Sequence, residues 1–88
     1  MAELLTNLFY THEYVGITDF NLYRNAGAIS IADPNLSYLN NPGIRYGVLL
    51  VFNAEIGYQI QMAISIDNEA WIRFNNINQN KYGEWAKL

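Results

Sequence analysis

Residues 58–66 alternate strictly between apolar and polar side chains. The apolar positions are Tyr58, Ile60, Met62, Ile64 and Ile66, and the intervening positions are Gln59, Gln61, Ala63 and Ser65. Successive side chains of a β-strand point to opposite faces of a sheet, so this pattern predicts a strand with one buried face. We expect the apolar set to form that face, with Ile60, Met62 and Ile64 in the core.

Further strands and turns follow the same order along the chain. Short alternating or apolar runs predict strands at residues 28–31, 46–52 and 70–74 and a terminal strand around Trp85. Residues 46–52 are almost entirely apolar, which is typical of a central strand covered on both faces. Breaks at 53–57 and 67–69 have the length of hairpin connections, and Asn68 tolerates positive φ. The sequence therefore predicts a mainly β fold, a small antiparallel meander sheet.

The N-terminal segment differs from the rest of the chain. Its apolar residues, Leu4, Leu5, Leu8 and Phe9, fall on one stripe of a short helix. We expect residues 1–16 to form a short N-terminal helix or extended arm and residues 17–88 to form a β domain. An axial segment that joins sister chains is the alternative. Thr18 or Asp19 can cap a turn or short helix at the start of the domain.

The composition favours association of the chain into an oligomer. The 88 residues allow one domain, and only 15% are charged although 51% are apolar, whereas about a quarter of an ordinary domain is charged. Twelve Asn residues supply uncharged polarity, and part of the surface is expected to be buried against another chain. There is no Cys, so disulfides cannot stabilise this small domain, and oligomerisation is a common substitute.

Several classes of function find no support in the sequence. The net charge is −3 and the five basic residues are scattered, which argues against nucleic acid. No apolar stretch reaches the roughly 20 residues of a membrane helix, and residues 1–16 lack the basic start of a signal peptide.

Residues able to carry chemistry are also sparse. His12 is the single histidine, and with Glu13 next to it this residue makes neither a zinc site nor a nucleophile–base pair. The carboxylates Asp33, Asp67 and Glu69 could suggest calcium, but the Asp67 to Glu69 pattern is too short for a calcium loop and is expected to be a tight turn. We therefore expect no enzymatic activity, no metal and no cofactor.

Aromatic side chains are the stronger signal, because they stack on sugar rings and anchor interfaces. Trp71 is expected in core or interface, and Trp85 to close the sheet. The loop at residues 32–43 is longer than most connections and has Tyr38 near its centre. We predict that glycan contact, if any, uses Tyr38 with Tyr46 or Tyr82 as a second wall. The neighbouring amides complete this set: Asn35, Asn40 and Asn41. Alternatively, Tyr38 is a plug between subunits.

The order of these elements resembles the knob domain of bacteriophage and R-type pyocin tail fibres. The resemblance covers residues 17–88 and rests on an ordered series of short motifs: Asp19-Phe20-Asn21, Gly27 to Ile31, Tyr46-Gly47, Tyr58-Gln59-Ile60-Gln61, Trp71-Ile72-Arg73 and Trp85-Ala86-Lys87-Leu88. The chain departs from that family after Gly27, where Ala28 and Ile29 replace aromatics, and in the loop at 32–43.

The resemblance implies a non-enzymatic fibre module, generally trimeric. It would be made in the cytoplasm of a bacterial host and built into the virion, in a tail fibre or baseplate, beside other tail proteins. Its function would be adsorption to the host surface, with a cell-surface glycan as the ligand. The alternative is a purely structural trimerisation or decoration module of the tail, baseplate or head fibre that binds no host ligand.

Overall fold

The structure is a computed structural model that describes residues 11–12 and 18–88. Its elements in chain order are β1 (Thr11–His12), the 3-10 turn η1 (Phe20–Leu22), β2 (Gly27–Ala32), β3 (Tyr46–Asn53), η2 (Glu55–Gly57), β4 (Tyr58–Ser65), β5 (Ala70–Asn76), η3 (Ile77–Gln79), β6 (Lys81–Tyr82) and β7 (Ala86–Lys87).

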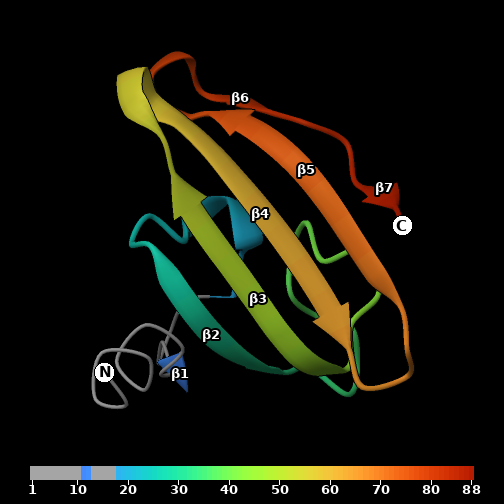
Figure 1. The fold of residues 1–88 in the computed structure, drawn as a ribbon. Coiled ribbons are helices and arrows are strands. Elements are labelled where there is room, and N and C mark those ends of the chain that lie inside the picture. Colours follow the sequence, from blue (N-terminus) through green and yellow to red (C-terminus); the bar gives the residue numbers. More distant parts are fainter. Residues whose placement is uncertain (1–10, 13–17) are drawn as a thin grey trace.

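The strands form one sheet, which confirms the predicted mainly β meander. The strand order is β1-β2-β3-β4-β5-β6, and β7 pairs with β5 beyond β6. Strands β2 to β6 pair antiparallel with their neighbours, whereas β1 lies parallel to β2. Figure 1 shows β2 to β5 side by side, with β6 and β7 following the far edge of β5.

Local turn chemistry fits the predicted boundaries. Asn68 has φ of 64° in the turn between β4 and β5, as its ability to adopt positive φ predicts. The side chain of Asp19 caps η1 by accepting a hydrogen bond from the backbone N–H of Asn21 at 2.9 Å. Ile56 is unexpected, since a β-branched residue adopts φ of 63° in η2. This conformation is costly for such a residue and marks η2 as a strained turn.

One face of the sheet, here called the inner face, carries the core. Residues that face each other in register share a face, and Leu49 pairs with Ile29 on one side and Ala63 on the other. The 18–25 segment and the 33–45 loop cover this face (Figure 1) and bury Phe20, Tyr23 and Ile44 against it. The core of this small domain therefore lies between the sheet and two irregular segments.

The predicted orientation of the alternating strand is wrong. The glutamine side of β4 is buried, with Gln59 1% and Gln61 0% exposed, whereas Ile64 is 39% exposed. The strand and its alternation are confirmed, but the polar side faces the core. The cause is the cover: the 18–25 segment lies over this side of β4, and its Phe20 and Tyr23 carbonyl groups accept hydrogen bonds from the Gln61 and Gln59 side chains.

The opposite side of β2 to β5, here called the outer face, is largely open in the described part of the chain, although Ala28 on β2 is buried. Its members alternate along each strand with the residues of the inner face: Ala28, Ser30, Ala32, Tyr46, Val48, Leu50, Phe52, Tyr58, Ile60, Met62, Ile64, Ala70, Ile72, Phe74 and Asn76. The expectation that β3 is covered on both faces is wrong for this chain alone, because Phe52 is 50% exposed.

The predicted N-terminal helix or arm, and with it the division into residues 1–16 and 17–88, lies largely outside the described residues. Thr11–His12 forms a strand, in agreement with the extended part of that prediction. Within residues 11–12 and 18–88, no helix has the length and apolar character needed to cross a membrane.

Candidate functional site

Two chains of hydrogen bonds cross the inner face and fix the sheet to its cover. In the first, Gln61 donates from Nε2 to the carbonyl oxygen of Phe20 at 2.8 Å and accepts at Oε1 from Nε of Arg73 at 2.7 Å. Gln61 and Arg73 are paired in register on β4 and β5. Both ends of the buried glutamine side chain are thus satisfied, which removes most of the cost of burying it.

The second chain runs parallel to the first, one pair further along the strands. Gln59 donates to the carbonyl oxygen of Tyr23 at 2.8 Å and accepts from Nδ2 of Asn75 at 3.1 Å. Asn75 in turn accepts from the backbone N–H of Gly83 at 3.0 Å. The two chains link the 18–25 segment to β4, β5 and the C-terminal tail in one polar layer.

Arg73 is the charged centre of this layer. Its side chain is buried, with the guanidinium 4.6 Å from the Trp85 ring centroid and 5.9 Å from that of Tyr82. Burial lowers the pKa of Arg73 to about 10, against the opposing effect of Asp19 and Tyr82. The guanidinium stays charged at neutral pH, and the aromatic rings stabilise it by cation–π contact.

The long loop after β2 is held by one buried carboxylate. Asp33 accepts from the backbone N–H of Ser37 and of Tyr38 at 2.8 and 2.9 Å, and from the side chains of Ser37 and Asn41 at 3.1 and 3.0 Å. Burial alone would raise the pKa of Asp33, but these hydrogen bonds outweigh it and lower the pKa below its ordinary value. The loop is therefore a folded structural unit.

The predicted binding residues of this loop serve mainly internal contacts. Tyr38 is half-buried and packs against the core cluster. Asn41 bonds Asp33 and the backbone of Ile44, and Asn40 donates to Asp19 at 2.8 Å. Asn35 is exposed. Tyr38 and Asn41 both donate to Asp33, whereas Asn40 donates to Asp19. The role of these residues in ligand binding stays a prediction.

The two predicted second walls lie in different places. Tyr46 begins β3 on the outer face and is 47% exposed, on the other side of the sheet from the core contacts of Tyr38. Tyr82 is half-buried at the opposite end of the sheet, where its hydroxyl accepts from Nη2 of Arg24 at 2.7 Å. The contact between Tyr82 and Arg24 was not predicted from the sequence.

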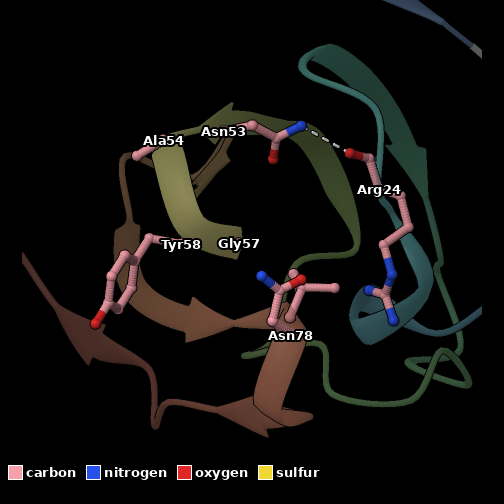
Figure 2. Close-up of a pocket in the computed structure, with 7 residues that line it drawn as sticks. Arg24, Asn53, Ala54, Gly57, Tyr58 and Asn78 are labelled. Atoms are coloured by element: carbon pink, nitrogen blue, oxygen red, sulfur yellow. Dashed lines mark hydrogen bonds between the residues drawn. The ribbon is translucent and has the colours of Figure 1, made fainter.

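A pocket of about 240 Å³ opens at this end of the sheet, beside η2 and η3 (Figure 2). The residues that line it come from three separate parts of the chain: Arg24, Asn53, Ala54, Gly57, Tyr58, Ile77 and Asn78. The turns η2 and η3 pack closely against each other beside the pocket. A Cβ atom added to Gly57 would lie 2.5 Å from the side chain of Asn78. Gly57 has φ of 78°, so a glycine suits both the turn and the contact.

The pocket combines apolar surface, including that of Ala54 and Ile77, with the amides of Asn53 and Asn78, and Arg24 is its one charged residue. Asn53 donates from Nδ2 to the carbonyl oxygen of Arg24 at 2.8 Å, and its Oδ1 accepts from Nε2 of Gln59 at 3.5 Å. Figure 2 shows the Asn78 amide between Asn53 and the Arg24 guanidinium, with the Tyr58 phenol pointing away from them. Amides of this kind both donate and accept hydrogen bonds, as sugar hydroxyl groups require.

Sequence reasoning missed this pocket. Asn53 and Asn78 lie in breaks that predict turns, and such residues are usually assigned to turn formation. Two breaks in the chain carry amide side chains: residues 75–80, and the hairpin connection that begins at Asn53. These two breaks are the sequence signal that could have found the pocket. Nothing local places Arg24 beside them.

Within residues 11–12 and 18–88, no group of three or more His, Cys, Asp or Glu side chains is placed to hold a metal ion. The buried carboxylate of Asp33 is fully used by the loop, and its low pKa makes it a poor proton donor.

Comparison with family models, with curated proteins and with solved structures finds no match for this chain. The resemblance to tail-fibre knobs therefore stays a prediction from sequence motifs.

Proposed function

We propose that this protein is a non-enzymatic receptor-binding module of a bacteriophage tail fibre or baseplate, acting as a homotrimer in adsorption to the bacterial surface. Its ligand is a cell-surface glycan, and its other partners are tail proteins of the virion. The motif series of residues 17–88 supports the tail-fibre assignment, and the mainly β fold is compatible with it.

The observation that carries the binding part of this proposal is the open pocket at Asn53 and Asn78. Its volume of about 240 Å³ lies below the roughly 300–1,000 Å³ of pockets for drug-sized ligands, so it suits a single small polar group such as one sugar ring. Arg24 extends the choice to sugars with a carboxylate, since a guanidinium pairs well with that group.

The alternative function is a trimerisation or decoration module of the virion that binds no host ligand. The extensive internal bonding of the 33–45 loop favours this alternative, because it leaves Tyr38 and Asn41 largely committed to the fold. The two functions differ in one measurable property, binding by the intact oligomer.

The experiment is binding of the purified protein to an array of bacterial envelope polysaccharides. We expect the parent to bind at least one class of polysaccharide and Asn78→Ala to weaken that binding at least tenfold. Gln79→Ala is the matched control, since Gln79 is the next residue, exposed and also an amide, yet outside the pocket. Tyr38→Ala tests the loop: lost binding with the oligomer intact assigns recognition there, and lost assembly assigns Tyr38 to the interface.

An intact oligomer that binds none of the polysaccharides would contradict the receptor-binding proposal and favour the structural alternative. Equal binding by the parent and Asn78→Ala would remove the pocket from the proposal.

A further inference from the structure

The outer face combines two properties that rarely occur together in a monomer. Its positions on β3, β4 and β5 are almost all apolar, yet many are open to solvent: Tyr46 47%, Phe52 50%, Tyr58 53%, Ile64 39% and Phe74 64% exposed. Phe52, Ile60 and Phe74 form one row across three strands. The alternation in residues 58–66 therefore places apolar side chains on a surface that the described residues leave partly exposed.

The size of this surface matches an interface. A fully exposed aromatic side chain offers roughly 150–250 Å², so the four exposed aromatics of the outer face leave roughly 300–500 Å² open. Isoleucines and half-buried residues between them enlarge the patch toward the roughly 800 Å² that each partner contributes to a standard interface. Monomeric proteins seldom expose contiguous apolar patches of more than a few hundred Å².

The chemistry of the face selects its partner. The outer face of β2 to β5 contains no Asp, Glu, Lys, Arg or His, so it offers no charge to pair with a partner of opposite charge. A flat, uncharged apolar face suits packing against other copies of this chain around a symmetry axis, and most soluble oligomers are symmetric assemblies of identical chains. The nearby acidic and basic residues lie on turns and edges, where they face solvent.

We infer that the outer face of β3, β4 and β5 is the interface between copies of this chain, with the Phe52, Ile60 and Phe74 row at its centre. This inference rests on the proposed oligomer and names the surface that forms it. The pocket beside η2 and η3 lies at the end of the sheet, and Tyr58 belongs both to its lining and to the outer face. In the assembly both faces of the sheet are buried, which accounts for the nearly continuous apolar sequence of β3.

The test compares two lysine substitutions at sites of similar exposure. Phe52 is 50% exposed on the outer face, and Leu22 is 53% exposed on η1, away from it. We expect light scattering at micromolar concentration to give a multiple of 10.1 kDa for the parent and for Leu22→Lys, and 10.1 kDa for Phe52→Lys. Far-UV circular dichroism shows whether each variant keeps its sheet. Phe74→Lys, 64% exposed on β5, replaces Phe52→Lys if that variant does not fold.

A parent of 10.1 kDa throughout this range would overturn the inference and assign the cover of the outer face to another protein or to another part of this chain. Folded Phe52→Lys and Phe74→Lys variants that keep the parent mass would also overturn it. If Leu22→Lys also gave a mass of 10.1 kDa, loss of the oligomer would not be specific to the outer face, and this result would count against the inference. Light scattering reports only the mass of the oligomer, whereas the polysaccharide array reports glycan binding. Failure of the interface can therefore be told apart from failure of glycan binding.

Discussion

Gln61 lies at the centre of the buried layer, with no exposed surface, although glutamine is usually found outside. It is retained there because its amide joins the Phe20 carbonyl group to Arg73. The same logic applies to Asp33, whose carboxylate gathers four donors of its loop. At the scale of residues, this domain is specified as much by satisfied polar groups as by apolar contacts.

Replacing Gln61 with leucine should destabilise the protein although it makes the core more apolar. The change leaves the Phe20 carbonyl oxygen and the Arg73 Nε–H buried without partners, each at a cost of roughly 1–3 kcal/mol. Met62→Leu, at the next position on the outer face, conserves volume and should cost less than about 1.5 kcal/mol. Urea unfolding measures both. A Gln61→Leu variant as stable as Met62→Leu would show that the hydrogen-bond chain contributes little.

Asp33 should make stability depend on pH on the acid side. Its pKa is lowered in the folded protein from 3.8, so the folded state gains stability that is fully present above that value and is lost as pH falls through the lower folded pKa. Asp33→Asn lacks this contribution. We expect it to be less stable than the parent at pH 7 by roughly 1–3 kcal/mol.

The difference between parent and Asp33→Asn should shrink below pH 4, as measured by thermal melting from pH 7 to pH 2. A difference that stays constant with pH would mean that the carboxylate is not charged in the folded loop.

At the scale of elements, the strands were predictable and the buried face was not. Alternation and turn residues such as Asn68 locate β2 to β5, because both signals are local. Which side of β4 is buried depends on where the 18–25 segment passes, and nothing near Gln59 and Gln61 encodes that path. The apolar side of β4 was wrongly predicted to be the core of the chain, and its burial by another copy is part of the proposed assembly.

The candidate site was harder to predict for the same reason. The loop at 32–43 stands out by length, yet the use of Asn41 and Asp33 inside it is visible only once it folds. The pocket joins Arg24 to Asn53 and Asn78, and no sequence period connects these positions. Tyr82 was selected as an aromatic next to a loop, and its contact with Arg24 places it beside this pocket.

The pairing of β3 with β4 depends on close approach at Gly47. A Cβ atom there would lie 2.0 Å from the carbonyl oxygen of Ile64, so Gly47→Ala must push the two strands apart. We expect a loss of roughly 1–3 kcal/mol or more, as for other overpacked sites. Ser30→Ala, exposed on neighbouring β2, should stay within about 0.5 kcal/mol of the parent. Thermal melting of both variants decides the matter; equal melting temperatures would contradict the close contact.

At the scale of the whole molecule, folding and association should be one process. The intrachain core has a polar layer across the inner face of the sheet, and exposed aromatic and aliphatic side chains lie on the outer face. If copies bind through that face, the folded oligomer is favoured by mass action, whereas a monomer is not. Stability then depends on protein concentration.

We therefore expect the melting temperature of the parent to rise with protein concentration. A tenfold increase stabilises each chain of an oligomer by roughly 1 kcal/mol, which for a domain of this size is about 4–8 °C. Phe52→Lys, which removes an apolar anchor of the outer face, should melt at one temperature at all concentrations and below the parent. Calorimetry of the parent and of Phe52→Lys at 10-fold and 100-fold dilution measures both melting temperatures. A concentration-independent parent would show that the 88-residue chain holds its fold without a second copy.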